Sequence, residues 1–128
     1  MRLLEVHIEV GDMDASVRLY KQLLDYQRVI HWDDGDAHAF ILKDGSAFGL
    51  WRAGKLGIHN GQGGKHVHFA FQISPGEYDR FTKRIEDAGL TPLHHDWGDG
   101  HRSVYFFDYD GHQGEFMTKD WLQDSLSG

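Results

Sequence analysis

The sequence predicts an α+β protein in which one β-α-β-β-β unit is written twice along 128 residues. Three observations predict this fold class. Strand and helix patterns repeat at one constant separation, each half closes with a hairpin that turns at Asp-Gly, and a glycine-rich stretch lies between the halves. The length corresponds to a single domain of residues 1–128, because domains cluster near about 100–150 residues.

Each half is predicted to begin with a strand in which apolar and polar residues alternate. The first strand spans Leu4–Val10 and carries His7 on its polar face, and the second spans Lys65–Ile73 and carries His68. Superposing V-H-I-E-V on V-H-F-A-F places His7 on His68, a separation of 61 residues. The alternation predicts half-buried strands that each present a histidine on the polar side.

An amphipathic helix is predicted after each strand. Asp14–Asp25 carries apolar residues at spacings of three and four, with Asp12 or Asp14 as the N-cap. Glu77–Ala88 repeats those spacings at the same separation of 61 residues, and Gly89 follows as a helix stop. The shared order and spacing predict that the two halves have the same fold.

A short strand and then a hairpin are predicted after each helix. The short strands lie around Arg28–Trp32 and Thr91–His95. The hairpins turn at Asp44-Gly45 and Asp110-Gly111, and Asp-Gly between apolar runs is a strong hairpin signal. Aligning the two turns gives an offset of 66 residues and places Glu115 on Gly49.

The halves define the expected domain organisation. We expect module 1 at about residues 1–53, a linker at 54–65, module 2 at about 66–120 and a C-terminal tail at 121–128. The linker contains five glycines in twelve residues, so we expect it to be flexible enough for the modules to pair within one chain or to be exchanged between two chains.

Composition excludes several classes of function. The net charge of −7 and the lack of a basic stripe argue against nucleic-acid binding. The sequence has no run of about 18 apolar residues that would predict a membrane span, and we expect no membrane partner. The chain has no cysteine, which fits a cytoplasmic protein and excludes thiolate ligands. With ten histidines and no cysteine, any metal would be held by nitrogen and oxygen ligands.

These motifs resemble the vicinal oxygen chelate superfamily, which includes glyoxalase I, bleomycin resistance proteins, fosfomycin resistance enzymes and extradiol dioxygenases. The matching segments are V-H-I-E-V, the helix pattern D-x-x-x-S-x-x-x-Y, H-F-A-F at His68, and Y-F-F-D-Y-D-G-H-Q-G-E-F. The resemblance implies that the two modules form a cupped mixed β-sheet with the helices outside and a metal inside the cup. It also implies a homodimer.

The resemblance assigns the metal ligands to His7, His68 and Glu115, which match the family's ligand positions one for one. Two imidazoles and one carboxylate leave coordination sites open for a substrate that binds through two oxygens. The expected cofactor is a divalent ion, Zn, Mn, Ni or Fe. Glyoxalase I enzymes have a second carboxylate at the position of Gly49, so a four-ligand site of that kind is not supported, although Glu5 or Glu9 could approach the metal. The competing interpretation is a solvated sheet face with ordinary surface side chains.

Five further residues are candidates for contact with a small substrate. Glu9 is a candidate general base, or else an ion-pair partner on the strand. Tyr105 is a candidate hydrogen-bond donor, or else a core aromatic. Trp51 and Trp97 would form apolar walls, although packing is the more common role of tryptophan, and Arg102 would hold an anionic group or lie on the surface.

The sequence therefore predicts a divalent-metal-dependent enzyme acting on a small substrate, with lyase, transferase and dioxygenase activities all open. Fosfomycin is disfavoured, because acidic or neutral residues replace phosphonate-binding and reaction-centre residues of the fosfomycin enzymes at Glu9, His95, Asp99 and Asp124. The alternative is a metal-free protein that sequesters a ligand, like bleomycin resistance proteins. Asp108 and Asp110 are interpreted as a turn and not as a calcium loop.

Overall fold

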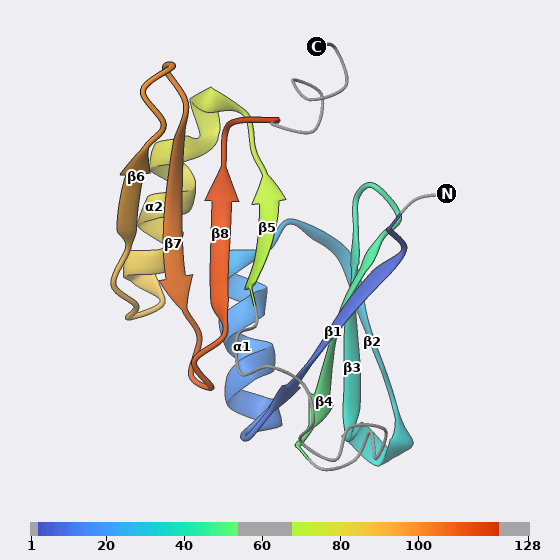
Figure 1. Ribbon diagram of the computed structural model, residues 1–128. Helices are drawn as coiled ribbons and strands as arrows, with labels where there is room; N and C mark the ends of the chain where they lie inside the picture. The colour runs from blue at the N-terminus through green and yellow to red at the C-terminus, as the bar shows by residue number, and fades with distance from the viewer. Residues whose placement is uncertain (1–2, 54–67, 121–128) are drawn as a thin grey trace. The chain divides into compact units, whose positions relative to one another are not determined.

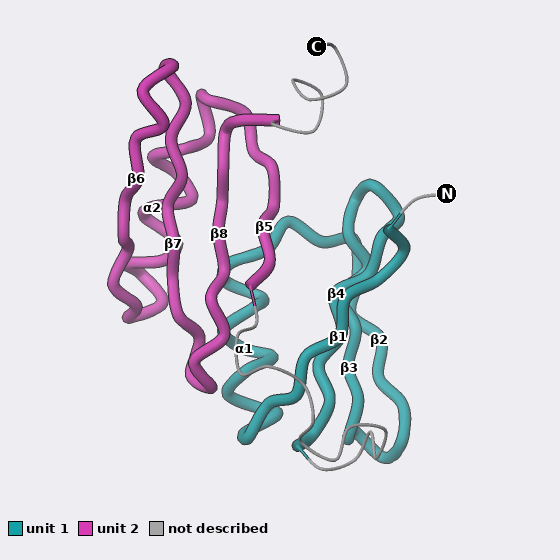
Figure 2. The backbone as a smooth tube through the Cα atoms, viewed as in Figure 1, with its two compact units in different colours: residues 1–64 teal, residues 65–128 magenta. Residues whose placement is uncertain are grey.

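The computed structural model describes residues 3–53 and 68–120. The chain divides into two compact units, residues 1–64 and residues 65–128 (Figure 2). Each unit has the element order β-α-β-β-β, and each contains a four-stranded mixed sheet. This confirms the predicted fold class. The predicted linker at 54–65 and tail at 121–128 lie outside the described residues.

Unit 1 is built from one helix and a four-stranded sheet. Its elements are β1 (Glu5–Val10), α1 (Met13–Leu23), β2 (Tyr26–Trp32), β3 (Ala37–Leu42) and β4 (Ala47–Arg52). The strand order is β1-β4-β3-β2 (Figure 1). The pair β1–β4 is parallel and the other pairs are antiparallel, so the first strand of the unit lies beside the last.

Unit 2 repeats this arrangement. Its elements are β5 (His68–Gln72), α2 (Tyr78–Asp87), β6 (Leu93–Asp96), β7 (Arg102–Phe107) and β8 (Gln113–Met117). The strand order is β5-β8-β7-β6, again with a parallel pair between first and last strands. Figure 1 shows α2 lying against one face of this sheet. The opposite face is therefore available for a site.

Both helices begin at local capping signals. The Asp12 side chain accepts a hydrogen bond from the main-chain N–H of Ala15 at 3.0 Å, so α1 begins at Met13, one residue earlier than predicted. A capping box between Ser74 and Glu77 precedes α2. Gly89 ends this helix with a φ of +81°, a conformation that glycine adopts at little cost.

Aromatic packing between helix and sheet forms the core of each unit. In unit 1, the rings of Tyr20 and Phe48 lie 4.8 Å apart and both are almost fully buried. In unit 2, the rings of Phe81 and Phe116 lie 4.6 Å apart, likewise out of solvent. Burying such a side chain contributes about 1.5–3 kcal/mol. This packing uses one face of each sheet and fixes which residues point to the other.

Neither helix in the described part of the chain is long and apolar enough to cross a bilayer.

Candidate functional site

In unit 2, three predicted site residues lie on neighbouring strands. His68 is on β5, Glu115 is on the central strand β8, and Tyr105 is on β7 directly opposite Glu115. Side chains of alternate residues share a face of a sheet, so Tyr105 and Glu115 point away from the buried neighbours Val104 and Phe116. The strand register therefore brings these polar groups together.

The carboxylate of Glu115 is the most unusual group in this cluster. Its oxygen Oε1 accepts a hydrogen bond from Nε2–H of His68 at 2.9 Å. The residue is only 3% exposed, and its second oxygen, Oε2, is buried and has no hydrogen-bond partner among the described residues. Burying a carboxylate oxygen without a partner is costly. The geometry therefore favours a cation or a donor from a ligand at this position.

Tyr105 lies beside this pair, with its ring centroid 6.2 Å from that of His68. Burial raises the pKa of the Tyr105 hydroxyl above its usual value, and the negative charge of Glu115 raises the pKa further. The phenol consequently stays protonated at neutral pH. It is a hydrogen-bond donor in this environment and not an anionic ligand.

A pocket of about 460 Å³ opens beside these groups within unit 2. Four polar residues and four apolar residues line it: His68, Tyr105, Glu115 and Lys119, and Phe69, Ala70, Trp97 and Met117. The ammonium group of Lys119 lies 2.5 Å from the carboxylate of Asp99, and the Trp97 indole donates to the hydroxyl of Ser103 at 2.9 Å. The pocket thus combines a mostly apolar wall with one carboxylate and one paired cation.

His7 lies in unit 1, on β1, where it makes one hydrogen bond and one close contact with a carboxylate. The indole Nε1–H of Trp51 donates to His7 Nδ1 at 2.9 Å, and His7 Nε2 lies 3.1 Å from Oε2 of Glu5. Gly49 pairs with His7 across the sheet, and a Cβ on Gly49 would lie 2.0 Å from Nδ1. The ring therefore lies directly over Gly49, where only glycine leaves room for it.

The other predicted contact residues lie in different surroundings. Glu9 is exposed on β1 and pairs in register with Trp51. Trp97 lines the pocket in unit 2. The guanidinium of Arg102 lies 3.8 Å from the ring centroid of Tyr78 and 4.0 Å from the carboxylate of Asp79, so helix α2 engages it and the pocket does not include it.

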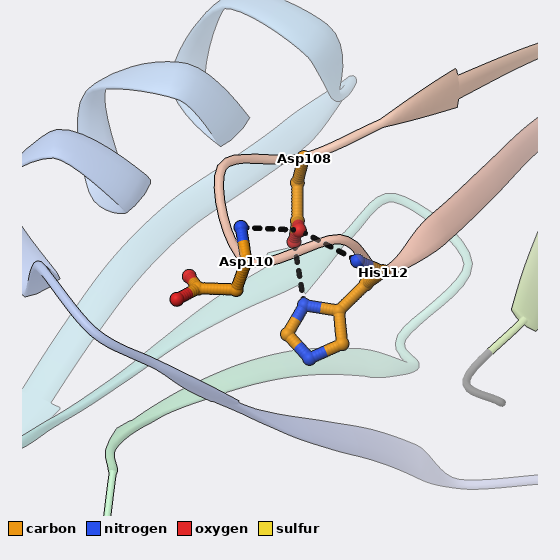
Figure 3. A group of neighbouring side chains, drawn as sticks. All are labelled: Asp108, Asp110 and His112. Atoms are coloured by element: carbon orange, nitrogen blue, oxygen red, sulfur yellow. Dashed lines mark hydrogen bonds and ion pairs between the residues drawn. The ribbon is translucent and has the colours of Figure 1, made fainter. Parts of the chain in front are cut away.

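Asp108, Asp110 and His112 form a second group of ionisable side chains, at the β7–β8 turn (Figure 3). Asp108 accepts hydrogen bonds from the main-chain N–H groups of Asp110 and His112, at 3.0 and 2.9 Å, and from His112 Nδ1 at 2.7 Å. The hydrogen bond to Asp108 raises the pKa of His112. One ligand atom from each of the three residues lies within 4.8 Å of the others, so the group could also hold a metal ion. The Asp110 carboxylate points away from the imidazole in Figure 3. The hydrogen bonds to Asp108 stabilise the β7–β8 turn.

Sequence reasoning placed Glu5 on the same strand face as His7 but did not single out Lys119. Glu5 contacts His7 from two residues earlier on β1, because residues two apart on a strand share a face. Lys119 lines the pocket just beyond the end of β8. No sequence pattern marked Lys119, since it lies past the predicted motif.

Comparison with known proteins places these features in a family. Residues 2–116 match the Glyoxalase/Bleomycin resistance protein/Dioxygenase superfamily. A fosfomycin resistance protein, FosX, from Listeria innocua is 30% identical over 119 residues, which cover 86% of this chain and 84% of that protein.

Solved structures show the same fold. A glyoxalase/dioxygenase from Nostoc punctiforme has a TM-score of 0.71 and 25% identity, with 91% of this chain and 89% of that chain covered. A FosX mutant from Listeria monocytogenes, complexed with Mn(II) and 1S,2S-dihydroxypropylphosphonic acid, has a TM-score of 0.74 and 22% identity, with 96% and 93% covered. The chain belongs to the Glyoxalase/Bleomycin resistance protein/Dioxygenase superfamily.

Proposed function

We propose that this chain is a divalent-metal-dependent enzyme that acts on a small molecule bound through oxygen atoms. His68 and Glu115 of unit 2 and His7 of unit 1 are the proposed ligands. Because these ligands come from two units, the proposal requires that the modules pair, either within one chain or between two chains of a homodimer. Membership of the superfamily and the Mn(II) named for the Listeria monocytogenes FosX structure support a divalent ion, with Zn, Mn, Ni and Fe as candidates.

The observation that carries this proposal is the buried carboxylate of Glu115. Its oxygen Oε1 accepts a hydrogen bond from His68. Its oxygen Oε2 has no hydrogen-bond partner among the described residues, although it is buried beside a pocket. A divalent ion would replace the proton on Nε2 of His68 and offset the cost of burying the negative charge of Glu115. The donor set of imidazole and carboxylate also fits a first-row divalent ion.

The side chains of unit 2 define what the site does with a substrate. A bound divalent ion would polarise the substrate oxygens as a Lewis acid. The protonated hydroxyl of Tyr105 donates a hydrogen bond to a substrate oxygen, while Phe69, Trp97 and Met117 contact its apolar part and exclude water. In this proposal Glu9 is the general base supplied by unit 1.

Metal analysis of the purified protein tests this function directly. Protein purified without added metal is analysed for bound ions, and its melting temperature is measured on addition of Mn, Ni, Zn or Fe(II). Glu115→Gln keeps the shape of the side chain but removes the charge, so we expect it to lose the metal-induced shift. Asp110→Asn is the matched control, because it removes a carboxylate from the turn group and leaves the proposed ligands intact.

Two outcomes would contradict the proposal in different ways. If wild type holds no metal and no ion changes its melting temperature, the proposal of a metal-dependent enzyme is wrong, and the alternative of a metal-free protein that sequesters a ligand takes its place. If Asp110→Asn abolishes the shift and Glu115→Gln does not, the metal lies at the turn group and the assignment of ligands is wrong.

Fosfomycin is the first substrate to assay, because the curated relative from Listeria innocua is a fosfomycin resistance protein. We expect weak turnover. Among the described residues that line the pocket, the only lysine or arginine is Lys119, and Asp99 already neutralises its charge. A dianionic phosphonate therefore meets no net positive charge from these side chains. Phosphorus NMR of fosfomycin incubated with the metal-loaded protein measures the reaction, and rapid consumption would refute this expectation.

A further inference from the structure

Trp51 in unit 1 has the same place relative to His7 that Glu115 in unit 2 has relative to His68. In each unit the histidine of the first strand pairs with a residue of the last strand, Gly49 for His7 and Gln113 for His68. Trp51 and Glu115 each lie two residues beyond that partner and so face the same side of their sheet. Each also makes a hydrogen bond of 2.9 Å to its histidine.

The two hydrogen bonds have opposite chemical sense. A carboxylate can only accept, so Glu115 accepts the hydrogen bond that Nε2–H of His68 donates. An indole N–H can only donate, so Trp51 occupies the lone pair of His7 Nδ1. A neutral imidazole has one N–H and one lone pair, and the proton of His7 must therefore lie on Nε2. The carboxylate oxygen Oε2 of Glu5 lies 3.1 Å from Nε2, and its negative charge favours a proton at that position.

The hydrogen bond from Trp51 thus leaves neutral His7 without a lone pair for a metal. A metal that binds Nδ1 must displace the indole. A metal that binds Nε2 requires the ring proton to move to Nδ1, where it would face the indole N–H. Both routes break the Trp51–His7 hydrogen bond, and Gly49 is the reason that the ring sits within reach of it.

We propose that Trp51 is a positioning residue that holds His7 in a metal-free arrangement and lowers the affinity of the proposed site for a divalent ion. This inference rests on the proposed function, because it takes His7 as a ligand. Trp51 would then tune metal binding and would not serve as the apolar substrate wall that the sequence predicts. The same geometry makes Trp51 a reporter, since its indole proton changes partner when metal binds.

Two NMR measurements and one affinity measurement test the proposal. The tautomer of His7 is read from long-range proton–nitrogen correlations of metal-free protein in alkaline buffer, and we expect the proton on Nε2. The indole N–H signal of Trp51, identified by its loss in Trp51→Phe, is followed during titration with diamagnetic Zn²⁺. We expect it to shift more than the other indole signals.

Metal affinity is measured by calorimetry for wild type and for two tryptophan variants. Trp51→Phe keeps an aromatic ring but removes the donor, and we expect Zn²⁺ to bind about 2- to 10-fold more tightly, the worth of one net hydrogen bond. Trp32→Phe is the matched control. Trp32 lies edge-on to Trp51, with ring centroids 5.6 Å apart. The Trp32→Phe variant should bind Zn²⁺ with the same affinity as wild type.

The outcomes separate this inference from the proposed function. Suppose that Zn²⁺ binding requires Glu115. If the affinity in Trp51→Phe is then unchanged or weaker, or if the His7 proton lies on Nδ1 before metal is added, the role of Trp51 is overturned and the proposed metal site stands. No Zn²⁺ binding by any variant would overturn both. If Trp51→Phe does not fold, the tautomer of His7 in wild type still decides the inference.

Discussion

Substituting alanine at Gly49 and at Gly114 should have different costs, because the side chains above the two glycines differ in freedom to move. A Cβ on Gly49 would lie 2.0 Å from Nδ1 of His7, and one on Gly114 would lie 2.1 Å from Cζ of Phe106. The His7 side chain is 22% exposed, whereas Phe106 is fully buried. His7 can turn aside, but Phe106 can move only by disturbing the core.

The expected magnitudes follow from these contacts. Turning His7 aside loses one hydrogen bond, about 1 kcal/mol, and forces an unfavourable rotamer, about 1 kcal/mol. Alanine recovers about 0.5–1 kcal/mol in a strand interior, so Gly49→Ala should lower the free energy of unfolding by about 1 kcal/mol. Overpacking Phe106 costs about 3 kcal/mol, and Gly114→Ala should cost about 2–2.5 kcal/mol after the same recovery.

Thermal unfolding of the two metal-free variants, followed by circular dichroism, checks this difference. At about 4 °C per kcal/mol for a chain of this size, Gly114→Ala should melt about 4–6 °C below Gly49→Ala. Only Gly49→Ala should change the indole N–H signal of Trp51. Equal melting temperatures, or a lower one for Gly49→Ala, would refute the argument that the mobility of the overlying ring sets the cost.

Three further predictions concern stability. Asp12→Ala removes the cap of α1 and should lower the free energy of unfolding by about 1 kcal/mol in urea titrations, and Asp12→Asn should restore most of it. Tyr78→Phe removes a buried hydroxyl that donates to the carbonyl of Ser103 at 3.1 Å, and should cost about 1–2 kcal/mol in the same assay; a neutral result would contradict the hydrogen bond. Asp108 raises the pKa of His112, so their bond stabilises the fold fully at pH values below the ordinary histidine pKa of about 6.5 and less as the pH rises through the raised pKa. His112→Gln should therefore cost less stability at alkaline than at mildly acidic pH, and a constant difference would disprove the linkage.

Local patterns in the sequence were sufficient to predict most elements of the fold. The alternation around His7 predicts β1, and the spacing of apolar residues after Asp12 predicts α1. The Asp-Gly turns predict both hairpins. These signals are local because a strand or helix shows its period within a few residues. Element ends were less certain: α1 ends at Leu23, two residues before the predicted end.

The site was only partly predictable. The strand alternation and the family resemblance identified His68, Glu115 and Tyr105 as candidate site residues. The structure places these three together on the sheet of unit 2. The pairing of Lys119 with Asp99 could not be predicted, because the two residues are 20 positions apart and no periodicity connects them. The role of Arg102 was also undetermined, since its contact with Tyr78 depends on the packing of α2.

The sequence by itself determined the repeated unit, its elements and which faces of the strands are polar. Tertiary structure alone decided the register between the first and last strand of each unit. Aligned by their turns, Glu115 falls on Gly49, but relative to the histidines it is Trp51 that corresponds to Glu115. The two alignments differ by two residues, a shift that keeps every side chain on its face and so leaves no trace in the hydrophobic pattern. Packing of the whole sheet sets that shift, and with it the partner of His7.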